Sequence, residues 1–360
     1  MSEMSETSVS PINFLAFFLR KRPKSIIILA IFFGILATLG TSAIFITSIG
    51  VDPLLAFYCL FEGAFGSVQS ISETLVVSIP LMIIGLGLSV AFSCNVWNIG
   101  AEGQLLMAAI TCSVIAIYFD LPGYIMIPLL LIIGFLTGAG YASLPGFLRA
   151  KYNVNEIIAT IMLNYIPIYL IDYLISGPMM EKRHLLPMSD LIQKTAVLGR
   201  ILPGTRLHSG LFIAIIIAVI IYFIMSKTTL GYELKASGLD AKASYYAGIN
   251  VKRNIILSMI ISGGLAGLAG MVELCGVQYR LKQGISPGYG YTAILVALLG
   301  KCHPIGVVLS SIFFGGLLVG SDFMQRGAGV PFALVYVIQG LLIFYVMLFE
   351  ALLISLSEKV

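Results

Sequence analysis

The sequence predicts an all-α, polytopic bundle of membrane-spanning helices. Of the 360 residues 59% are hydrophobic and 11% are charged, whereas roughly 25% are charged in ordinary soluble domains. The mean hydropathy is +1.01. Apolar residues form continuous runs of the length that a helix needs to cross a bilayer, about 20 residues. A globular fold could not hide so much apolar surface from water, so lipid must surround most of the chain.

Ten apolar runs predict ten spans, with polar loops between them. The run 288–300 is short for a full span, and 95–104 is a polar interruption between two runs. Lys and Arg gather in the loops that this arrangement places in the cytoplasm, as cytoplasmic loops usually do. The predicted spans lie near 25–49, 72–94, 101–119, 124–146, 155–176, 209–226, 254–276, 288–300, 304–321 and 331–353.

Both ends of the chain are predicted to be cytoplasmic. Residues 1–24 are polar and then amphipathic, and they close on basic residues before a long apolar run. That run is too long for the apolar core of a cleaved signal peptide, so we expect a retained first helix. A transmembrane domain would then occupy residues 25–353, and residues 354–360 would form a cytoplasmic tail. Gly138–Tyr165 and Gly315–Leu342 resemble each other weakly, which suggests two inverted five-helix repeats as a hypothesis.

The first polar segment runs from Asn95 to Gln104 and interrupts an apolar hairpin. It contains Asn95, Trp97, Asn98, Glu102 and Gln104 together with two glycines. Ionisable groups at membrane depth normally face a partner or a water-filled cavity, and broken helices line transporter sites. An alternative stays open, in which the segment is a cytoplasmic turn and Glu102 stabilises the start of the next helix.

The second polar segment follows Lys151. Asn153 is expected to cap the next helix, with Glu156 three residues later as in a capping box. Thr160 and Asn164 come four and eight residues after Glu156, so the three side chains share one helix face. Such a face on a membrane helix would contact either a substrate or another helix.

The third segment, 227–253, is the longest charged connection on the predicted cytoplasmic side. Its centre is a short helix-compatible stretch between Gly238 and Gly248. A helix of this length is unstable alone, so it must dock on a partner or rest on lipid headgroups.

Other features predict packing or exclude chemistry. Small residues recur through Ser262–Glu273 and favour close helix contacts. The five cysteines are scattered, and His184, His208 and His303 are far apart, so we expect neither a metal site nor a cofactor. The chain has no Walker-type nucleotide loop and no nucleophile motif, so it is not expected to be an enzyme. Its basic residues sit in loops between apolar runs, so it is not expected to bind nucleic acid.

Taken together, these segments resemble one protein family. Their order, followed by Ser286–Tyr291, Val296–Gly300 and Val337–Gly340, is similar to that of permease subunits of ATP-binding-cassette importers for simple sugars and nucleosides. The resemblance covers roughly residues 72–345. The form of Asn98–Gln104 is more like the nucleoside branch.

The resemblance implies partners and a division of labour. A cytoplasmic ATPase would dock on the coupling residues, an external solute-binding lipoprotein would deliver a nucleoside or simple sugar, and a second, paralogous permease would complete the path through the lipid. The implied coupling residues are Gly238, Leu239, Asp240, Ala241, Lys242, Ala243 and Gly248. The candidate residues of the substrate pathway are Asn95, Trp97, Asn98, Glu102, Gln104, Asn155, Glu156, Thr160, Asn164 and Gln339.

A competing interpretation is an ion-coupled secondary transporter of a small polar solute. Glu102, Glu156 and Glu273 would then carry the coupling ion, and transport would need no ATPase.

Overall fold

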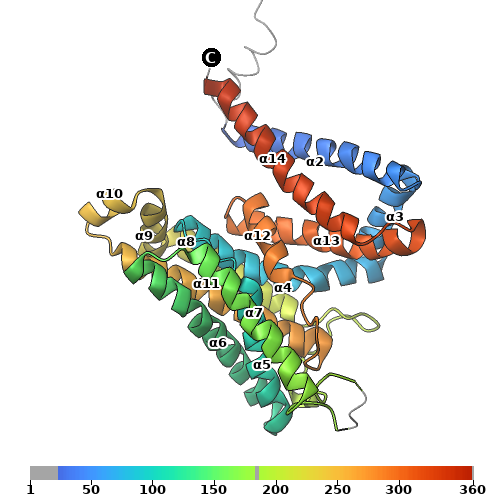
Figure 1. Ribbon diagram of the computed structural model, residues 1–360, viewed down its shortest axis with the longest axis vertical. Coiled ribbons are helices and arrows are strands. Elements are labelled where there is room, and N and C mark those ends of the chain that lie inside the picture. Colours follow the sequence, from blue (N-terminus) through green and yellow to red (C-terminus); the bar gives the residue numbers. More distant parts are fainter. Residues whose placement is uncertain (1–22, 183–185, 359–360) are drawn as a thin grey trace, which may run out of the picture. The chain divides into compact units, whose positions relative to one another are not determined.

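The computed structural model describes residues 23–182 and 186–358, and these residues are almost entirely helical (Figure 1). Within these ranges there are isolated β-bridges but no β-strand, which confirms the predicted all-α bundle. The helices are α2 (Pro23–Ser48), α3 (Pro53–Phe65), α4 (Val68–Ser93), α5 (Ala101–Tyr118), α6 (Gly123–Tyr152), α7 (Glu156–Ser176), α8 (Gly210–Lys227), α9 (Thr229–Leu239), α10 (Ala241–Tyr246), α11 (Val251–Glu273), α12 (Tyr289–Leu299), α13 (Pro304–Ala328) and α14 (Ala333–Glu358), with a 3-10 turn η1 (Lys194–Ala196) and a π-helical turn η2 (Leu274–Gln278).

Nine helices in the described ranges are long and apolar enough to cross a membrane, and each coincides with a predicted span. The tenth predicted span, 288–300, is wrong as a full crossing. It is the 11-residue helix α12, whose length of about 16 Å is half of the roughly 30 Å hydrocarbon core. A second short apolar helix, α3, was not predicted.

The chain divides into two compact units. The first comprises the residues up to Leu60 and those from Ser321 onward. In it α2 packs along α14, where Gly34 lies against the backbone of Val346 and leaves no space for a larger side chain. A small apolar core fills this unit, made of Ile46, Ala56, Met324, Val330 and Val335.

The second unit, residues 61–320, is a bundle around α4 and α11. Helix α4 is buried on nearly every side, as its apolar composition all round predicts. Helices α6 and α11 touch at glycines: a Cβ on Gly138 would collide with Gly263 and Gly267 of α11. This contact confirms the packing role predicted for the small residues of Ser262–Glu273.

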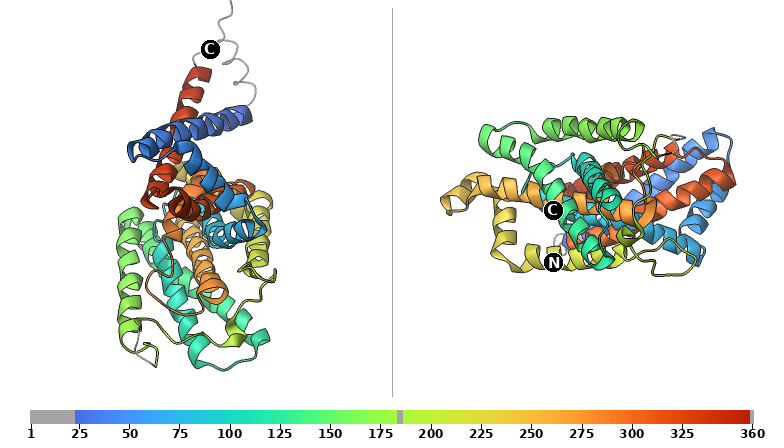
Figure 2. Two further views of the ribbon diagram at one scale, coloured as in Figure 1. Left: turned by 90° about the vertical axis from the view of Figure 1, so that its right-hand side faces the viewer. Right: turned by 90° about the horizontal axis from the view of Figure 1, so that it is seen from below.

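Two features mark opposite ends of the second unit (Figures 1 and 2). At one, the α10 end, α9 and α10 project from the bundle. At the other, the long-loop end, the connection between α7 and α8 folds back over the turn that follows α11. Backbone hydrogen bonds from Ser189 to Leu281 and from Leu198 to Cys275 hold it there. Arg206 also donates to both carboxylate oxygens of Glu73 at 2.9 and 3.0 Å.

Candidate functional site

The loop between α4 and α5 is held inside the second unit by a closed set of amide hydrogen bonds. Asn98 and Gln104 exchange two bonds, each 2.9 Å long, between their side-chain amides. Asn98 also donates to Ser262 Oγ of α11 at 2.9 Å. Asn98 and Gln104 are completely buried, so their polar groups are satisfied by protein, as buried polar groups require.

The polar face predicted on α7 is present and is turned toward this loop. Glu156, Thr160 and Asn164 are all buried. Thr160 Oγ1 accepts from the N–H of Ile99 at 3.3 Å. Asn164 Oδ1 accepts from the N–H of Gly103 at 2.9 Å, and its Nδ2 donates to the carbonyl of Ile99 at 3.0 Å. A broken stretch of backbone is therefore paired with side chains of a neighbouring helix.

The position of these contacts along α7 gives their depth in the bundle. Asn164 lies eight residues after the first residue of α7, which is a rise of about 12 Å. Gly103, at the start of α5, meets Asn164 at this level. The loop therefore dips into the bundle beside α7.

Glu102 joins α5 to the start of α12. Its Oε2 accepts from the N–H of Gly290 at 2.7 Å, and its side chain is almost completely buried. Gly290 packs directly on the backbone of Ala101 and Glu102, where a Cβ would collide. Tyr291 on the next position accepts a hydrogen bond from Asn164 Nδ2 at 3.1 Å. Glu102 thus stabilises the N-terminus of α12.

A cavity of about 250 Å³ lies beside Glu102, between α5, α7 and the segment before α12. Its wall combines apolar residues with carboxylates, an amide and hydroxyls. The lining residues are Glu102, Leu106, Ile168, Ile171, Asp172, Gln283, Gly284, Ser286, Gly288 and Tyr291. Concave, mostly apolar sites with a few polar groups are typical of small-molecule binding.

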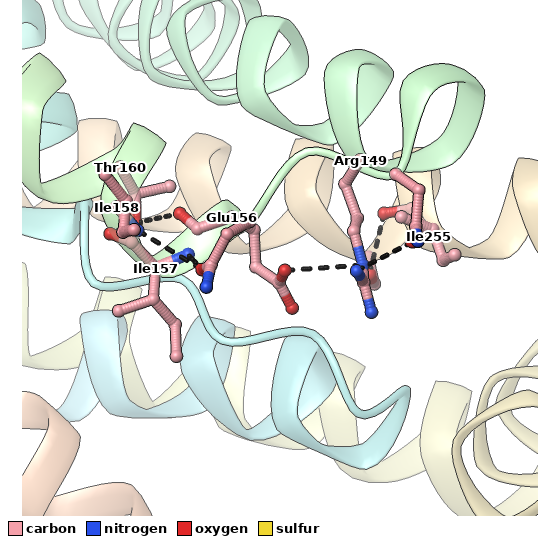
Figure 3. Close-up of polar contacts among 9 residues, drawn as sticks. Arg149, Glu156, Ile157, Ile158, Thr160 and Ile255 are labelled. Carbon is pink, nitrogen blue, oxygen red and sulfur yellow. Dashed lines mark hydrogen bonds and ion pairs between the residues drawn. The ribbon is translucent and has the colours of Figure 1, made fainter.

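The junction between α6 and α7 differs from the predicted capping box. Asn155, not Asn153, is the cap: its Oδ1 accepts from the N–H of Ile157 at 3.0 Å. Asn153 instead ends α6 with φ of 54°, a left-handed conformation that asparagine tolerates. Glu156 pairs with Arg149 at 3.3 Å, and Figure 3 shows the two side chains pointing toward each other. The predicted cap, Asn153, is thus wrong, because α6 continues to Tyr152 and Asn153 ends that helix.

Several predicted pathway residues lie outside this cluster. Asn95 is exposed in the α4–α5 loop, and Trp97 packs on Phe92 with ring centroids 4.8 Å apart. Gln339 belongs to α14 in the first unit, where it is buried and its Nε2 has no hydrogen-bond partner among the described residues.

The predicted coupling segment forms α9 and α10. Gly238 lies directly on the backbone of Ser93 and Cys94 at the end of α4, so that a Cβ would collide. Asp240 caps α10, accepting from the N–H of Lys242 at 2.8 Å. The tip is otherwise uncovered: Leu239, Tyr245 and Tyr246 are 89%, 74% and 88% exposed.

Alongside this tip, a concave surface runs between α10 and the start of α11. It is lined by Ala241, Lys242, Tyr245, Tyr246, Gly248, Ile249, Asn250, Val251 and Lys252. Asn254 near the start of α11 donates to Ser237 Oγ of α9 at 2.9 Å, which fixes α9 against α11.

The third glutamate of the ion-coupled alternative is separate from the other two. Glu273 is buried at the end of α11, and its Oε1 accepts from Gln278 Nε2 at 2.8 Å. Within the described ranges, no group of His, Cys, Asp and Glu residues is arranged to hold a metal ion.

Sequence reasoning assigned no individual role to Ser262, Tyr291 or Gly290. Gly290 and Tyr291 entered it only as part of the segment Ser286–Tyr291, and Ser262 only as part of the small-residue stretch Ser262–Glu273.

The chain is similar to known proteins over most of its length. A family model described as the permease component of the branched-chain amino acid transport system matches residues 70–347. The chain is 36% identical to the guanosine ABC transporter permease protein of Bacillus subtilis, over 87% of this chain and 91% of the relative. It is 39% identical to the nucleoside ABC transporter permease protein of Lactococcus lactis, over 89% of each. It is 34% identical to the glucose ABC transporter permease protein of Haloferax volcanii, over 88% of this chain and 86% of the relative. No solved structure matches the chain.

These similarities cover most of the sequence. Proteins of this family are transport proteins and not enzymes, and an ABC permease works with an ATPase subunit and a solute-binding protein. The ion-coupled alternative is not favoured. The chain is a multi-pass membrane protein and belongs to the family of ABC-importer permease components that the matching model represents.

Proposed function

We propose that this chain forms part of the translocation path of an ATP-driven nucleoside importer, with both termini in the cytoplasm. The observation that carries the proposal lies at the α10 end. The exposed helix α10 follows Gly238 of α9, and Gly238 packs on the backbone of Ser93 and Cys94, directly before the buried polar loop. A partner that moves this tip would move the loop. The nucleoside substrate is favoured by two of the three relatives, which are named for guanosine and for nucleosides. A simple sugar is the second candidate because the third is named for glucose.

The candidate pathway residues have different roles in this proposal. Glu102 lines the cavity and contacts solute or its water. Asn98, Gln104, Thr160 and Asn164 hold the loop in shape, because their polar groups are engaged with protein. Trp97 contributes a half-exposed apolar wall. Of the remaining candidates, Asn155 and Glu156 are engaged with protein at the start of α7. Asn95 is exposed in the α4–α5 loop, and Gln339 lies in the first unit.

The partners bind at opposite ends of the second unit. A cytoplasmic ATPase docks on the α10 end, where Leu239, Tyr245 and Tyr246 are exposed. An external solute-binding lipoprotein docks on the long-loop end. A paralogous second permease supplies the other wall of the path.

Transport follows from a shift between two populations of the permease. ATP-driven closure of the ATPases pushes the α10 ends, and the tight Gly238 contact passes this displacement to the end of α4. The polar loop and α12 then change position together, because Glu102 and Asn164 bind both. Small displacements at such packed contacts select between discrete arrangements.

The test is uptake of labelled nucleosides and glucose by cells that express the complete transporter. We expect nucleoside uptake that stops when ATP is depleted. Gly238→Leu should lower uptake by about tenfold or more, because its side chain has no space against Ser93 and Cys94. Gly140→Leu is the matched control, since a Cβ at Gly140 meets nothing within 4 Å. Uptake that persists without ATP and is equal in both variants would refute the proposal.

A further inference from the structure

One face of α7 is lined by exposed tyrosines. Tyr165, Tyr169 and Tyr173 are 50%, 65% and 67% exposed and recur every four residues. The rings of Tyr165 and Tyr169 are stacked, with centroids 6.4 Å apart and an angle of 19° between the ring planes. On a lipid-facing helix, tyrosines gather at the membrane interfaces. Here they follow the helix for about 12 Å, from near its end at Ser176 to its middle at Tyr165, so they extend away from the helix end.

Asp172 lies on the same face. It comes seven residues after Tyr165 and three after Tyr169, the spacing of neighbours on one side of a helix. It is half-buried and lies within a membrane-spanning helix, yet it forms no hydrogen bond or ion pair with any residue in the described ranges. A carboxylate in such a segment normally faces a water-filled cavity or a partner.

Asp172 lines the cavity beside Glu102, which gives its carboxylate a space that a ligand or water can enter. Asp172 and Ile168 of α7 line it, opposite Glu102 and Ser286. Glu102 is already engaged with the N–H of Gly290, and Ser286 Oγ accepts from the N–H of Tyr289 at 3.1 Å. One oxygen of Glu102 is thus already bound to protein, whereas both oxygens of Asp172 are available to accept hydrogen bonds from a ligand. None of the described residues that line the cavity is basic, so it suits a solute without phosphate.

We propose that this cavity and the tyrosine face together form a nucleoside subsite, an assignment that rests on the proposed function. The two oxygens of Asp172 accept hydrogen bonds from the 2′- and 3′-hydroxyls of the ribose. The base stacks on the Tyr165–Tyr169 pair, because an aromatic ring can stack on the face of any base without contacting its hydrogen-bonding edge. The volume of about 250 Å³ is close to the lower end of small-molecule pockets, roughly 300–1,000 Å³. The three tyrosines do not line the cavity itself, but they share a face of α7 with Asp172, so in this proposal they continue the site along the helix.

The first test measures maximal import rates in the complete transporter at saturating substrate. Under this condition, differences in how well the solute-binding protein delivers each substrate do not affect the rate. Asp172→Asn should lower the rate for a ribonucleoside by about tenfold, because a charged acceptor is lost. It should change the rate for a 2′,3′-dideoxynucleoside by less than about twofold, because that substrate lacks both hydroxyls. Asp120→Asn, an exposed carboxylate between α5 and α6, is the matched control and should leave both rates unchanged.

The second test replaces the tyrosine ring. Tyr169→Ala should lower the import rate for both substrates, since both retain a base, and Tyr169→Phe should lower it less because the ring remains. Tyr124→Ala, at an exposed tyrosine of α6, is the control and should have no effect.

The outcomes separate the two claims. Equal losses for both substrates in Asp172→Asn, or no loss for either, would overturn the subsite while leaving nucleoside import intact. A Tyr169→Ala rate equal to that of Tyr124→Ala would overturn the stacking role. A wild-type transporter that imports no nucleoside would overturn the proposed function and the subsite with it.

Discussion

His208 lies at the long-loop end, where its ring packs against Gly210 and Gly276. Its Nδ1 accepts from the N–H of Gly210 at 3.1 Å, a bond that only the deprotonated nitrogen can make. Burial lowers the pKa of His208 from its usual 6.5 to about 4. The unfolded chain therefore takes up the proton first as the pH falls, so His208 stabilises the fold above pH 6.5 and this contribution is lost toward pH 4.

Replacing His208 should remove this pH dependence. We expect the melting temperature of the wild type in detergent to fall further between pH 7.5 and pH 4.5 than that of His208→Gln. His303→Gln changes an exposed histidine and should follow the wild type. An identical dependence on pH in all three proteins would contradict the assignment.

The amide pair of Asn98 and Gln104 makes a second prediction at the scale of single residues. Asn98→Ala leaves the Gln104 amide and Ser262 Oγ without their buried partner. Each unsatisfied group costs about 1–3 kcal/mol, so we expect a lower free energy of unfolding and a lower yield of folded protein. Ser262→Ala removes one bond and should destabilise less. Equal stability of Asn98→Ala and the wild type would show that the loop does not depend on the pair.

At the scale of elements, glycines set the distance between helices. On α6, Gly138 abuts Gly263 and Gly267 of α11, whereas two residues further on Gly140 faces open space. The same helix therefore contains a position that cannot accept a side chain and one that can.

This pair makes a matched comparison. Gly138→Leu should separate α6 from α11 and prevent a stable, monodisperse protein from being recovered in detergent, because overpacking at close helix contacts is strongly destabilising. Gly140→Leu should give a wild-type elution profile and yield. Normal recovery of Gly138→Leu would show that this contact is not needed for the bundle.

At the scale of the whole molecule, the sequence predicts the spans better than the contacts between them. Apolar runs give nine of the ten predicted helices because length and hydropathy are local properties. The exception, α12, is too short to span, and its start depends on Glu102, 188 positions away in the sequence. The bond between Asn164 and Tyr291 joins parts of the chain that are 127 positions apart. No local pattern encodes such pairs.

In the candidate site, too, local features were predicted from the sequence and contacts between distant residues were not. Sequence reasoning placed Glu156, Thr160 and Asn164 on one face, because helix periodicity requires it. It did not find Asp172 or the tyrosine face, because a tyrosine or aspartate in an apolar run has the same sequence signature whether it faces lipid, water or a neighbour. Their significance comes from the cavity, which only the folded bundle creates.

We propose that this chain supplies the path for the solute and that a partner supplies the energy. The most direct measurement is nucleoside uptake into proteoliposomes that contain the complete transporter, with ATP supplied on the side of the ATPase. The account predicts uptake that requires ATP and is lost in Gly238→Leu. Uptake driven by a proton or sodium gradient alone, without ATP, would contradict it.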